Sequence, residues 1–377
     1  MLNNKELQRY SRQIIIPEFG QEGQLKLKGS SVLVIGAGGL GAPILQYLTA
    51  AGIGRIGIVE FDEVSISNLQ RQVLFESGQV GDSKAERTKE RLNKLNPEVQ
   101  IQVFEAAINS ENALELIEQF DMVVDGSDNL ATRYLVNDAC YFLNRPLVYG
   151  AIFRFEGQVS VFNQEYEGRR GPNYRDLFPT PPPPEMVPSC SEGGVLGVLP
   201  GIIGSMMASE AIKVLTGIGE TLSGRLFVFD ALDFTTHTLK VAKNVENPIS
   251  GDQPSIHELI DYEVFCMGEL NAETVQEISV QELAEKLKEE DVFVLDVRED
   301  YEYELANIGG TLIPLNKVVS QQGQIPKDRE VVVMCKMGGR SQKAIDLLKE
   351  QGFDNLLNLK GGISAWQKEI DPSLLAY

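Results

Sequence analysis

The stretch from Val32 to Gly41 constrains the fold more than any other part of this chain. It reads Val-Leu-Val-Ile-Gly-Ala-Gly-Gly-Leu-Gly, so four apolar residues run into a turn that carries Gly36, Gly38, Gly39 and Gly41. Apolar residues at helical spacing follow at once. This order predicts a buried strand, a glycine turn and a helix N-terminus whose unpaired N–H groups attract a phosphate. Dinucleotide oxidoreductases, methyltransferases and nucleotide-activating enzymes share the motif, so the turn alone does not identify the ligand.

Length and composition indicate a multidomain protein without a membrane or nucleic-acid role. A chain of 377 residues is too long for one ordinary core, and its 43% hydrophobic and 23% charged residues are typical of globular proteins. The net charge of −20 disfavours a broad nucleic-acid surface. No apolar run is long enough to span a bilayer, and residues 1–20 lack the layout of a signal peptide, so we expect a cytoplasmic protein.

The cysteines are scattered along the chain, with no closely spaced pair. This pattern favours a cytosolic protein with one or two working thiols over a disulfide scaffold. The four are Cys140, Cys190, Cys266 and Cys335. Cys140 sits in an apolar helical pattern and Cys266 has no charged surroundings, so we expect both to be passive.

Two acids follow the second predicted strand, Arg55–Asp62. Glu60 and Asp62 come about 20 residues after the glycines, where an acid of a βαβ unit binds a ribose hydroxyl. Up to this point the sequence supports an NAD-dependent dehydrogenase as well as it supports a nucleotide-activating enzyme.

The next polar segments favour a triphosphate over NAD. Arg71 and, further on, Lys84 supply two cations, and a triphosphate needs more neutralisation than helix N–H groups give. Asp128 follows an apolar strand and is well placed to hold Mg²⁺ on phosphates. A dehydrogenase commonly needs an acid–base residue such as histidine, and the only histidines, His237 and His257, lie far downstream.

Together these residues resemble the MoeB/ThiF adenylyltransferases, bacterial relatives of the ubiquitin-activating enzymes. The match covers about residues 5 to 245 and is most specific in Ser67-Asn-Leu-Gln-Arg-Gln72. The resemblance implies a Rossmann-like α/β domain with a mainly parallel sheet that uses ATP and Mg²⁺. It also implies adenylation of the C-terminal glycine of a ubiquitin-like sulfur carrier of the MoaD or ThiS type, with release of pyrophosphate.

The resemblance also implies the roles of individual residues. Glu60 and Asp62 would bind the ribose, Arg71 and Lys84 the phosphates, and Asp128 the Mg²⁺. Arg12 matches an arginine that reaches the nucleotide of the other subunit, which implies a homodimer. The full set of expected nucleotide-binding residues is Gly36, Gly38, Gly39, Gly41, Glu60, Asp62, Asn68, Arg71, Gln72, Lys84, Asp128 and Asn129.

Residues 163–200 are rich in loops and proline and form a predicted crossover segment. Near its end, Cys190 precedes Ser-Glu-Gly-Gly-Val. It is either a small core residue or, as the resemblance implies, a thiol that attacks the acyl-adenylate or forms a disulfide with the carrier.

The chain departs from this family at its structural zinc. Relatives use two Cys-x-x-Cys pairs, whereas the matching stretches here are Asn173-Tyr-Arg-Asp176 and Asn247-Pro-Ile-Ser250. Zinc in structural sites needs thiolate or imidazole ligands, so we predict no zinc.

A second α/β domain is predicted at residues 275–377, after a linker at 246–274. Glu330–Cys335 is a predicted strand that runs into Lys336-Met-Gly-Gly-Arg-Ser341 and a helix. Cys335 would therefore face loop N–H groups and a helix N-terminus, with Lys336 and Arg340 adjacent, which favours the thiolate.

This second domain resembles a single rhodanese domain over about residues 276–370. Four residues separate Cys335 from Arg340, against five in the phosphatase loop, and a smaller cradle suits a terminal sulfur atom better. Asp296-Val-Arg-Glu299 and Gly361-Gly-Ile-Ser-Ala-Trp366 are further matches. The implied role is to carry a persulfide on Cys335.

The two resemblances together imply a two-domain sulfurylase of sulfur-carrier proteins. Cys335 persulfide would attack the acyl-adenylate, and Cys190 would resolve the acyl-disulfide. The sulfur donor would be a cysteine desulfurase or thiosulfate, and the pathway, whether molybdopterin, thiamine, cysteine or thiolated tRNA, stays open. Two alternatives remain: a carrier-free thiosulfate sulfurtransferase with a degenerate nucleotide domain, and an NAD-linked oxidoreductase with a redox-sensing tail.

Overall fold

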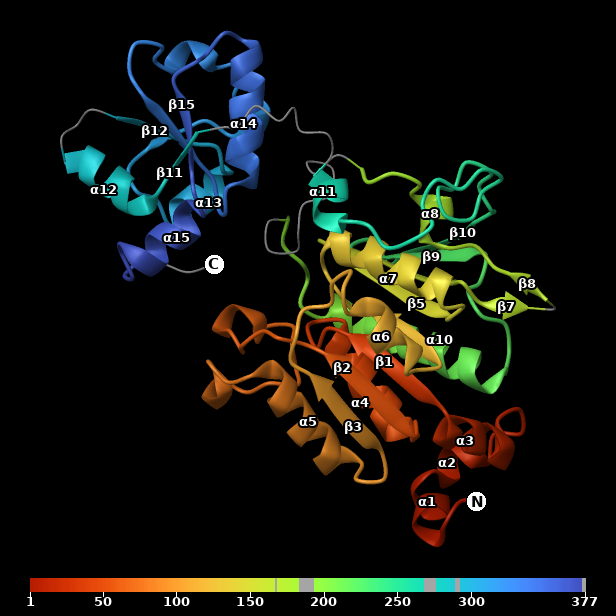
Figure 1. Ribbon diagram of the computed structural model, residues 1–377. Helices are drawn as coiled ribbons and strands as arrows, with labels where there is room; N and C mark the ends of the chain where they lie inside the picture. The colour runs from red at the N-terminus through yellow and green to blue at the C-terminus, as the bar shows by residue number, and fades with distance from the viewer. Residues whose placement is uncertain (167, 183–192, 268–275, 289–291, 375–377) are drawn as a thin grey trace. The chain divides into compact units, whose positions relative to one another are not determined.

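The computed structural model divides the chain into two compact units, residues 1–268 and 269–377 (Figure 1). It describes residues 1–166, 168–182, 193–267, 276–288 and 292–374. The first unit includes residues 246–267, which the sequence predicts as part of a linker, as well as the residues before them. The reason is burial, because Ile249 and Tyr262 from this segment enter the packing of the first unit.

The first unit is built on an eight-stranded sheet in the order β10-β9-β6-β5-β4-β1-β2-β3. Five neighbouring strands, from β5 to β3 in this order, run parallel, and β6, β9 and β10 are added antiparallel. The strands are β1 (Ser31–Ile35), β2 (Arg55–Val59), β3 (Gln100–Phe104), β4 (Met122–Asp125), β5 (Leu147–Phe153), β6 (Glu156–Phe162), β9 (Arg225–Asp230) and β10 (Thr235–Lys240). A separate two-stranded ribbon pairs β7 (Glu165–Tyr166) with β8 (Arg169–Arg170).

Helices cover both faces of this sheet. They are α1 (Asn4–Arg9), α2 (Ser11–Ile14), α3 (Gly20–Gly29), α4 (Gly41–Ala51), α5 (Lys84–Leu95), α6 (Ala113–Glu118), α7 (Leu130–Phe142), α8 (Tyr174–Leu177), α10 (Leu199–Thr216) and α11 (Tyr262–Met267), with short 3₁₀ turns at Ile66–Asn68 and Ser77–Gln79. Among the described helices, none combines the length and apolar character needed to cross a bilayer.

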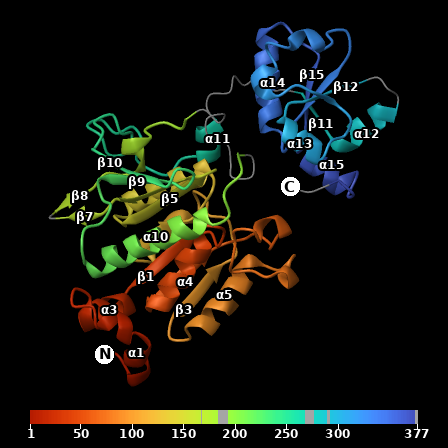
Figure 2. The ribbon, with the colours of Figure 1, turned by 180° about the vertical axis from the view of Figure 1, so that it is seen from behind.

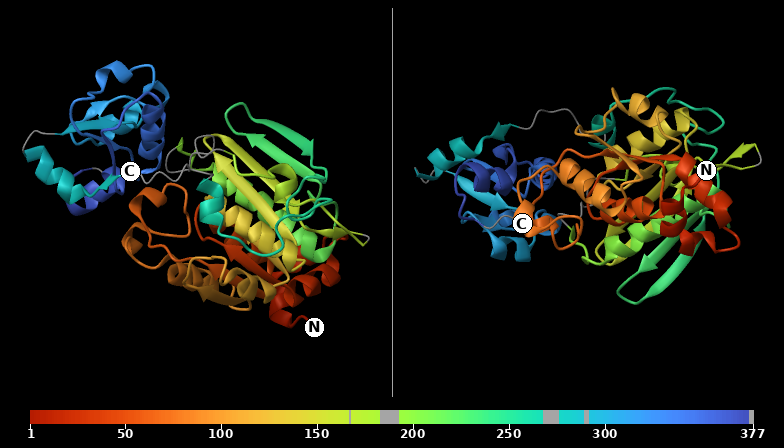
Figure 3. Two further views of the ribbon diagram at one scale, coloured as in Figure 1. Left: turned by 45° about the horizontal axis from the view of Figure 1, so that its top comes forward. Right: turned by 90° about the horizontal axis from the view of Figure 1, so that it is seen from below.

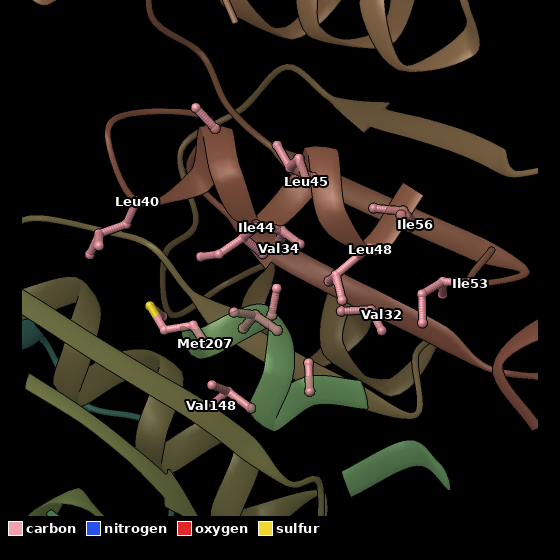
Figure 4. Close-up of a cluster of buried hydrophobic side chains, with 14 of the residues drawn as sticks. Val32, Val34, Leu40, Ile44, Leu45, Leu48, Ile53, Ile56, Val148 and Met207 are labelled. Atoms are coloured by element: carbon pink, nitrogen blue, oxygen red, sulfur yellow. The ribbon is translucent and has the colours of Figure 1, made fainter. Parts of the chain in front are cut away.

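The alternation of side chains along β1 divides the core into two layers. Val32 and Val34 point to the layer that contains α4 and α10, as the side chains in Figure 4 show. Leu33 and Ile35 point to the opposite layer, which contains α6 and α7. Figure 2 shows α4 and α10 side by side across the first of these faces. Because β1 is buried on both sides, its continuous apolar run is what a central parallel strand requires.

The antiparallel edge of the sheet is open to solvent. Every residue of β10 is exposed, and the β9–β10 pair appears as the green hairpin at the side of the first unit in Figure 3. The glycine turn lies well inside the sheet instead, since β1 has β4 on one side and β2 on the other.

The second unit is a smaller α/β domain with a five-stranded parallel sheet in the order β11-β15-β14-β12-β13. Its strands are β11 (Glu277–Ile278), β12 (Phe293–Asp296), β13 (Thr311–Leu312), β14 (Val331–Met334) and β15 (Leu356–Leu359). Its helices are α12 (Val280–Lys288), α13 (Asp300–Leu305), α14 (Gly339–Glu350) and α15 (Gly362–Glu369), with 3₁₀ turns at Leu315–Lys317 and Gln322–Gln324. α14 packs on one face, and α12 and α15 on the other. The predicted α/β class, with a mainly parallel sheet in each part, is confirmed.

Candidate active sites

The glycine turn joins β1 to α4 through a contact that excludes side chains. Gly36 has φ +86° and donates its N–H to the carbonyl of Val59 at 2.9 Å. A Cβ added at Gly41 would lie 2.1 Å from the carbonyl oxygen of Gly36, so only glycine lets α4 start this close to the turn. Leu40, at the N-cap of α4, makes no side-chain capping bond, which leaves the helix N-terminus open to an anion.

A cavity of about 290 Å³ opens at the carboxyl ends of β1, β2 and β4, beside this turn; we call it the edge cavity. Ten of the predicted nucleotide-binding residues line it: Gly36, Gly38, Gly39, Glu60, Asp62, Arg71, Gln72, Lys84, Asp128 and Asn129.

Three predicted residues are placed elsewhere, and a fourth is not described. Gly41 and Asn68 do not line the edge cavity, since Gly41 packs under the turn and Asn68 ends the 3₁₀ turn before Arg71. Arg12 lies exposed on α2. Cys190 lies outside the described residues.

The two acids after β2 have different surroundings. Glu60 is buried, and both of its oxygens already accept backbone N–H groups: Oε2 from Ala37 and Oε1 from Phe61 and Asp62, all at 2.9 Å. Asp62 has a 55% exposed side chain that pairs at 3.0 Å with Nζ of the buried Lys84. Glu60 thus braces the glycine turn, while Asp62 presents its carboxylate to the edge cavity.

Three buried polar atoms in and beside the edge cavity have no hydrogen-bond partner among the described residues. They are Oε1 of Gln72, Oγ of Ser127 and Oδ2 of Asp125. Buried polar groups are normally satisfied, so unpaired ones facing a cavity indicate a polar ligand. Burial also raises the pKa of Asp125, although Arg133 and the N–H of Ser127 oppose this.

The donor set fits MgATP better than a cage made of protein ligands alone. No group of three or more His, Cys, Asp or Glu side chains within the described parts of the chain could hold a metal ion. Mg²⁺ commonly takes only one or two carboxylates and completes its shell with phosphates and water. Asp128, exposed at the cavity wall, could supply such a carboxylate.

Sequence reasoning missed several residues of the cavity wall, above all Arg133. Asn129 caps α7 by accepting the N–H of Thr132 at 2.8 Å, and Arg133 lies one helical turn beyond this cap. The spacing from Asn129 to Arg133 was therefore the available signal. Other missed wall residues are Phe61, Ala107, Ile108, Ser127, Thr132 and Ile152.

The four positions that match the zinc ligands of relatives come together as a hydrogen-bonded cluster. This polar clasp consists of Asn173, Asp176, Asn247 and Ser250. Nδ2 of Asn247 donates to Oδ1 of Asn173 at 3.1 Å and to Oδ1 of Asp176 at 2.8 Å. Nδ2 of Asn173 donates to Oγ of Ser250 at 2.8 Å. Because these polar atoms satisfy one another and offer no thiolate or imidazole, the clasp does not fit zinc.

A buried ion pair lies next to the polar clasp. Arg175, fully buried, donates to both carboxylate oxygens of Asp138 on α7, with its shortest contact at 2.7 Å. The hydroxyl of Tyr262 donates to the same carboxylate at 2.8 Å, and burial raises the pKa of that phenol. The pair and the clasp thus fasten α8, α7 and the start of α11 to one another.

In the second unit, Cys335 follows β14 and begins a loop that ends in the first turn of α14; we call residues 335–341 the Cys335 loop. Cys335 is buried, with 1% of the residue exposed, and its sulfur accepts the N–H of Gly338 at 3.1 Å. The hydroxyl of Ser341 lies 3.4 Å from the sulfur and 2.7 Å from Oδ1 of the buried Asn358. The N–H of Gly338 is thus aimed at the sulfur, as stabilisation of an anionic sulfur requires, while the single hydroxyl proton of Ser341 has nearer acceptors in Oδ1 of Asn358 and the carbonyl of Gly338.

The Gly361–Trp366 motif holds this loop from the other side. The N–H groups of Ile363 and Ser364 donate to the carbonyls of Cys335 and Lys336 at 3.0 and 3.1 Å. A Cβ at Gly362 would lie 2.4 Å from the carbonyl oxygen of Cys335. α15 therefore packs its N-terminus directly on the backbone of the Cys335 loop.

Arg340 is engaged in an ion pair rather than left as a simple cation beside the sulfur. Its two Nη atoms donate to the two oxygens of Glu302 at 2.6 and 2.8 Å. Burial alone would raise the pKa of Glu302, but the bonds from Arg340 and from the N–H of Glu299 hold it below its ordinary value. A second buried pair, Asp296 with Arg298, supports the same region.

The other two cysteines that the structure describes take no part in either site. Cys140 is fully buried in α7, and burial raises the pKa of its thiol. Cys266 lies partly buried in α11 and packs at the edge of the core of the first unit. Both placements agree with passive roles.

Family comparisons match both units. The ThiF family model matches residues 10–249, and the rhodanese-like domain model matches residues 279–369. The chain belongs to the ThiF family, with a rhodanese-like domain at its C-terminal side. The enzyme class predicted from the sequence, an adenylyltransferase joined to a sulfurtransferase, is confirmed.

Individual relatives match all or part of this chain. A probable adenylyltransferase/sulfurtransferase MoeZ of Mycobacterium tuberculosis is 46% identical over 385 residues, covering 100% of this chain and 96% of that protein. A sulfur carrier protein adenylyltransferase of Thermus thermophilus is 55% identical over 263 residues, covering 70% of this chain and 97% of that protein. The crystal structure of E. coli MccB matches 68% of this chain and 76% of its own with a TM-score of 0.58, and at 22% identity it shows the fold alone.

Proposed function

We propose that this chain adenylates the C-terminal glycine of a ubiquitin-like sulfur-carrier protein and then converts it to a thiocarboxylate. One observation carries the proposal: the wall of the edge cavity gathers the glycine turn, Asp62, Arg71, Lys84 and Asp128 together with two unpartnered polar atoms. The relatives' names support it, since one is called a sulfur carrier protein adenylyltransferase and another an adenylyltransferase/sulfurtransferase.

The first step joins two anions, so the chain's contribution is alignment and charge neutralisation. The glycine turn and the N-terminus of α4 hold phosphate, Asp62 binds the ribose, and Arg71 and Lys84 offset the phosphate charge. The carrier's carboxylate oxygen forms a bond to the α-phosphorus, and pyrophosphate leaves with the electron pair of the broken P–O bond. Mg²⁺ on Asp128 would neutralise further phosphate charge when bound.

The second step moves sulfur from Cys335. A persulfide on Cys335, loaded by a cysteine desulfurase or by thiosulfate, attacks the acyl carbonyl through its terminal sulfur, and AMP leaves with the electrons of the C–O bond. A second thiol, for which Cys190 is the sequence-predicted candidate, attacks Sγ of Cys335 and releases the thiocarboxylate. The disulfide left on the enzyme is then reduced by an external thiol. We also propose a homodimer in which Arg12 reaches the partner's nucleotide.

The test is carrier-dependent exchange of labelled pyrophosphate into ATP, together with the mass of the carrier. Wild-type protein with MgATP and a sulfur source should exchange pyrophosphate and should raise the carrier's mass by replacement of one oxygen with sulfur. Asp128→Ala should lose exchange, whereas Cys335→Ser should keep exchange and lose the mass gain. The exposed Asp252 provides the matched control Asp252→Ala, which should keep both. Wild-type-like exchange by Asp128→Ala would sink the proposal.

A further inference from the structure

The wall of the edge cavity carries a cation that the proposed ATP contacts leave unused. Arg133 lies on α7, on the β4 side, with Gly126, Ser127 and Asp128. Glu60, Asp62 and Lys84 lie on the β2 side. The glycine turn after β1 lies between them, because β1 is the strand between β2 and β4. The cavity wall therefore has three parts along the sheet edge, which follow β2, β1 and β4. The part that follows β4 carries the positive charge of Arg133.

The surroundings of Arg133 hold its side chain in place. Its guanidinium lies 5.7 Å from the ring centre of Tyr149, and its Nη2 is 3.4 Å from the carbonyl oxygen of Ser127. Tyr149 is buried on β5. A stacked and hydrogen-bonded guanidinium loses less freedom when it binds an anion, and its fork of N–H groups matches a carboxylate.

A buried polar atom of the wall beside Arg133 points to a ligand there. Ser127 lines the cavity, and its Oγ is buried without a hydrogen-bond partner among the described residues. Asp125 lies behind this wall, where its Oδ1 accepts the N–H of Ser127 at 2.9 Å and its Oδ2 has no partner among the described residues. A peptide terminus supplies both kinds of group, since its carboxylate pairs with a guanidinium and its last N–H groups reach an acceptor.

We propose that Arg133 is the residue that binds the C-terminal carboxylate of the carrier and holds it against the α-phosphate. This rests on the proposed function and assigns the acceptor side of the same cavity. In the step given above, the carboxylate oxygen that attacks phosphorus is thus positioned by Arg133, while Arg71 and Lys84 hold the phosphates. Arg133 acts on the carrier and not on ATP.

The experiment uses the full chain and a recombinant MoaD-type or ThiS-type carrier ending in glycine, whichever the wild-type chain adenylates. Arg133→Gln should raise the KM for carrier in pyrophosphate exchange at least tenfold and leave the dissociation constant for ATP within twofold. Arg133→Lys should restore part of the loss. Arg91, exposed on α5, supplies the control Arg91→Gln, which should change neither value.

A second measurement identifies the group that Arg133 contacts. The same carrier with its C-terminal carboxylate converted to an amide should bind wild type at least tenfold more weakly than the free acid. The Arg133→Gln variant should bind acid and amide equally. Equal penalties for amidation in both proteins, or a loss of ATP affinity in Arg133→Gln, would overturn the inference.

Loss of Arg133 also leaves the buried Asp125 without its nearby positive charge. If Arg133→Gln does not fold, the double variant Arg133→Gln/Asp125→Asn removes both charges, and it should still not distinguish acid from amide. Failure of the proposed function gives a different result, because wild type would then adenylate neither carrier. If the wild-type chain adenylates the carrier and Arg133→Gln does so with an unchanged KM for carrier, the assignment of Arg133 is wrong and the proposed function stands.

Discussion

The edge cavity and the polar clasp use the same kinds of residue in opposite ways. Both lie in the first unit, and both gather aspartate and amide side chains with an arginine nearby. In the clasp, Asn173, Asp176 and Asn247 bond to one another and to backbone N–H groups. In the edge cavity, Gln72 and Ser127 keep buried oxygen atoms without a partner among the described residues.

Whether the buried polar atoms are paired therefore distinguishes a structural cluster from a ligand-binding site more reliably than the types of residue do. A polar cluster that satisfies itself gains nothing from a ligand, and its members are needed for stability. A cluster that leaves buried atoms unpaired costs stability in the free protein, and that cost is recovered when a ligand supplies the missing bonds. The same substitution should therefore change different properties in the two places.

The largest contrast is expected from one substitution, aspartate to alanine, made in the buried ion pair next to the polar clasp and in the edge cavity. Asp138→Ala leaves Arg175 buried without its carboxylate, and breaking such a pair costs about 3–5 kcal/mol. Asp128→Ala removes an exposed side chain of the cavity wall, so the free energy of unfolding should change by less than about 0.5 kcal/mol. Denaturant unfolding of the full chain, with its first-unit transition followed separately, measures both.

ATP binding provides the reverse readout on the same two proteins. Asp128→Ala should weaken MgATP binding, and folded Asp138→Ala should keep it. If the two variants lose similar amounts of stability, the contrast between a closed and an open cluster is wrong.

Ten of the residues chosen from the sequence line the edge cavity because they follow strand ends at fixed spacings. Gly36, Asp62 and Asp128 each stand after a parallel strand, and parallel strands bring their carboxyl ends to one edge. The same reasoning located Cys335 at the start of its loop. Local pattern was sufficient wherever a strand positions the residue directly.

It failed where a contact joins segments distant in the chain. The polar clasp joins residues more than 70 positions apart, such as Asn247 and Asn173, and no local sequence pattern predicts these contacts. Arg340 pairs with Glu302, 38 positions away in the chain. The carboxylate of Glu302 offsets the positive charge of Arg340, which the sequence alone places beside the sulfur. Tyr262 of the predicted linker packs on the first unit through its bond to Asp138, 124 positions away.

A smaller contrast is expected from amide side chains. Asn247→Ala removes two donated bonds and also the acceptor for the N–H groups of Ile249 and Ser250, so it should cost about 1–3 kcal/mol of stability. Gln72→Ala removes a buried oxygen that has no partner among the described residues, so it should cost less stability than Asn247→Ala does. Its affinity for ATP should fall about tenfold, which corresponds to about 1.4 kcal/mol. Denaturant unfolding gives the stability of each variant, and ATP titration gives the affinity of each. A stability loss in Gln72→Ala equal to that in Asn247→Ala would contradict the contrast between the edge cavity and the polar clasp.

The smallest effect is expected from a metal chelator, because the polar clasp has no need of zinc. Treatment with a strong zinc chelator should leave the unfolding midpoint of the first unit unchanged, and elemental analysis should find less than about 0.1 zinc per chain. Finding one tightly held zinc per chain would contradict this.

The clasp geometry can be tested further by replacing Asn173, Asp176, Asn247 and Ser250 together with cysteine. Since the four side chains already lie within hydrogen-bond distance of one another in pairs, the quadruple variant should bind one zinc and become sensitive to the chelator. A variant that stays folded and binds no zinc would show that the positions of the four residues do not suit tetrahedral zinc coordination.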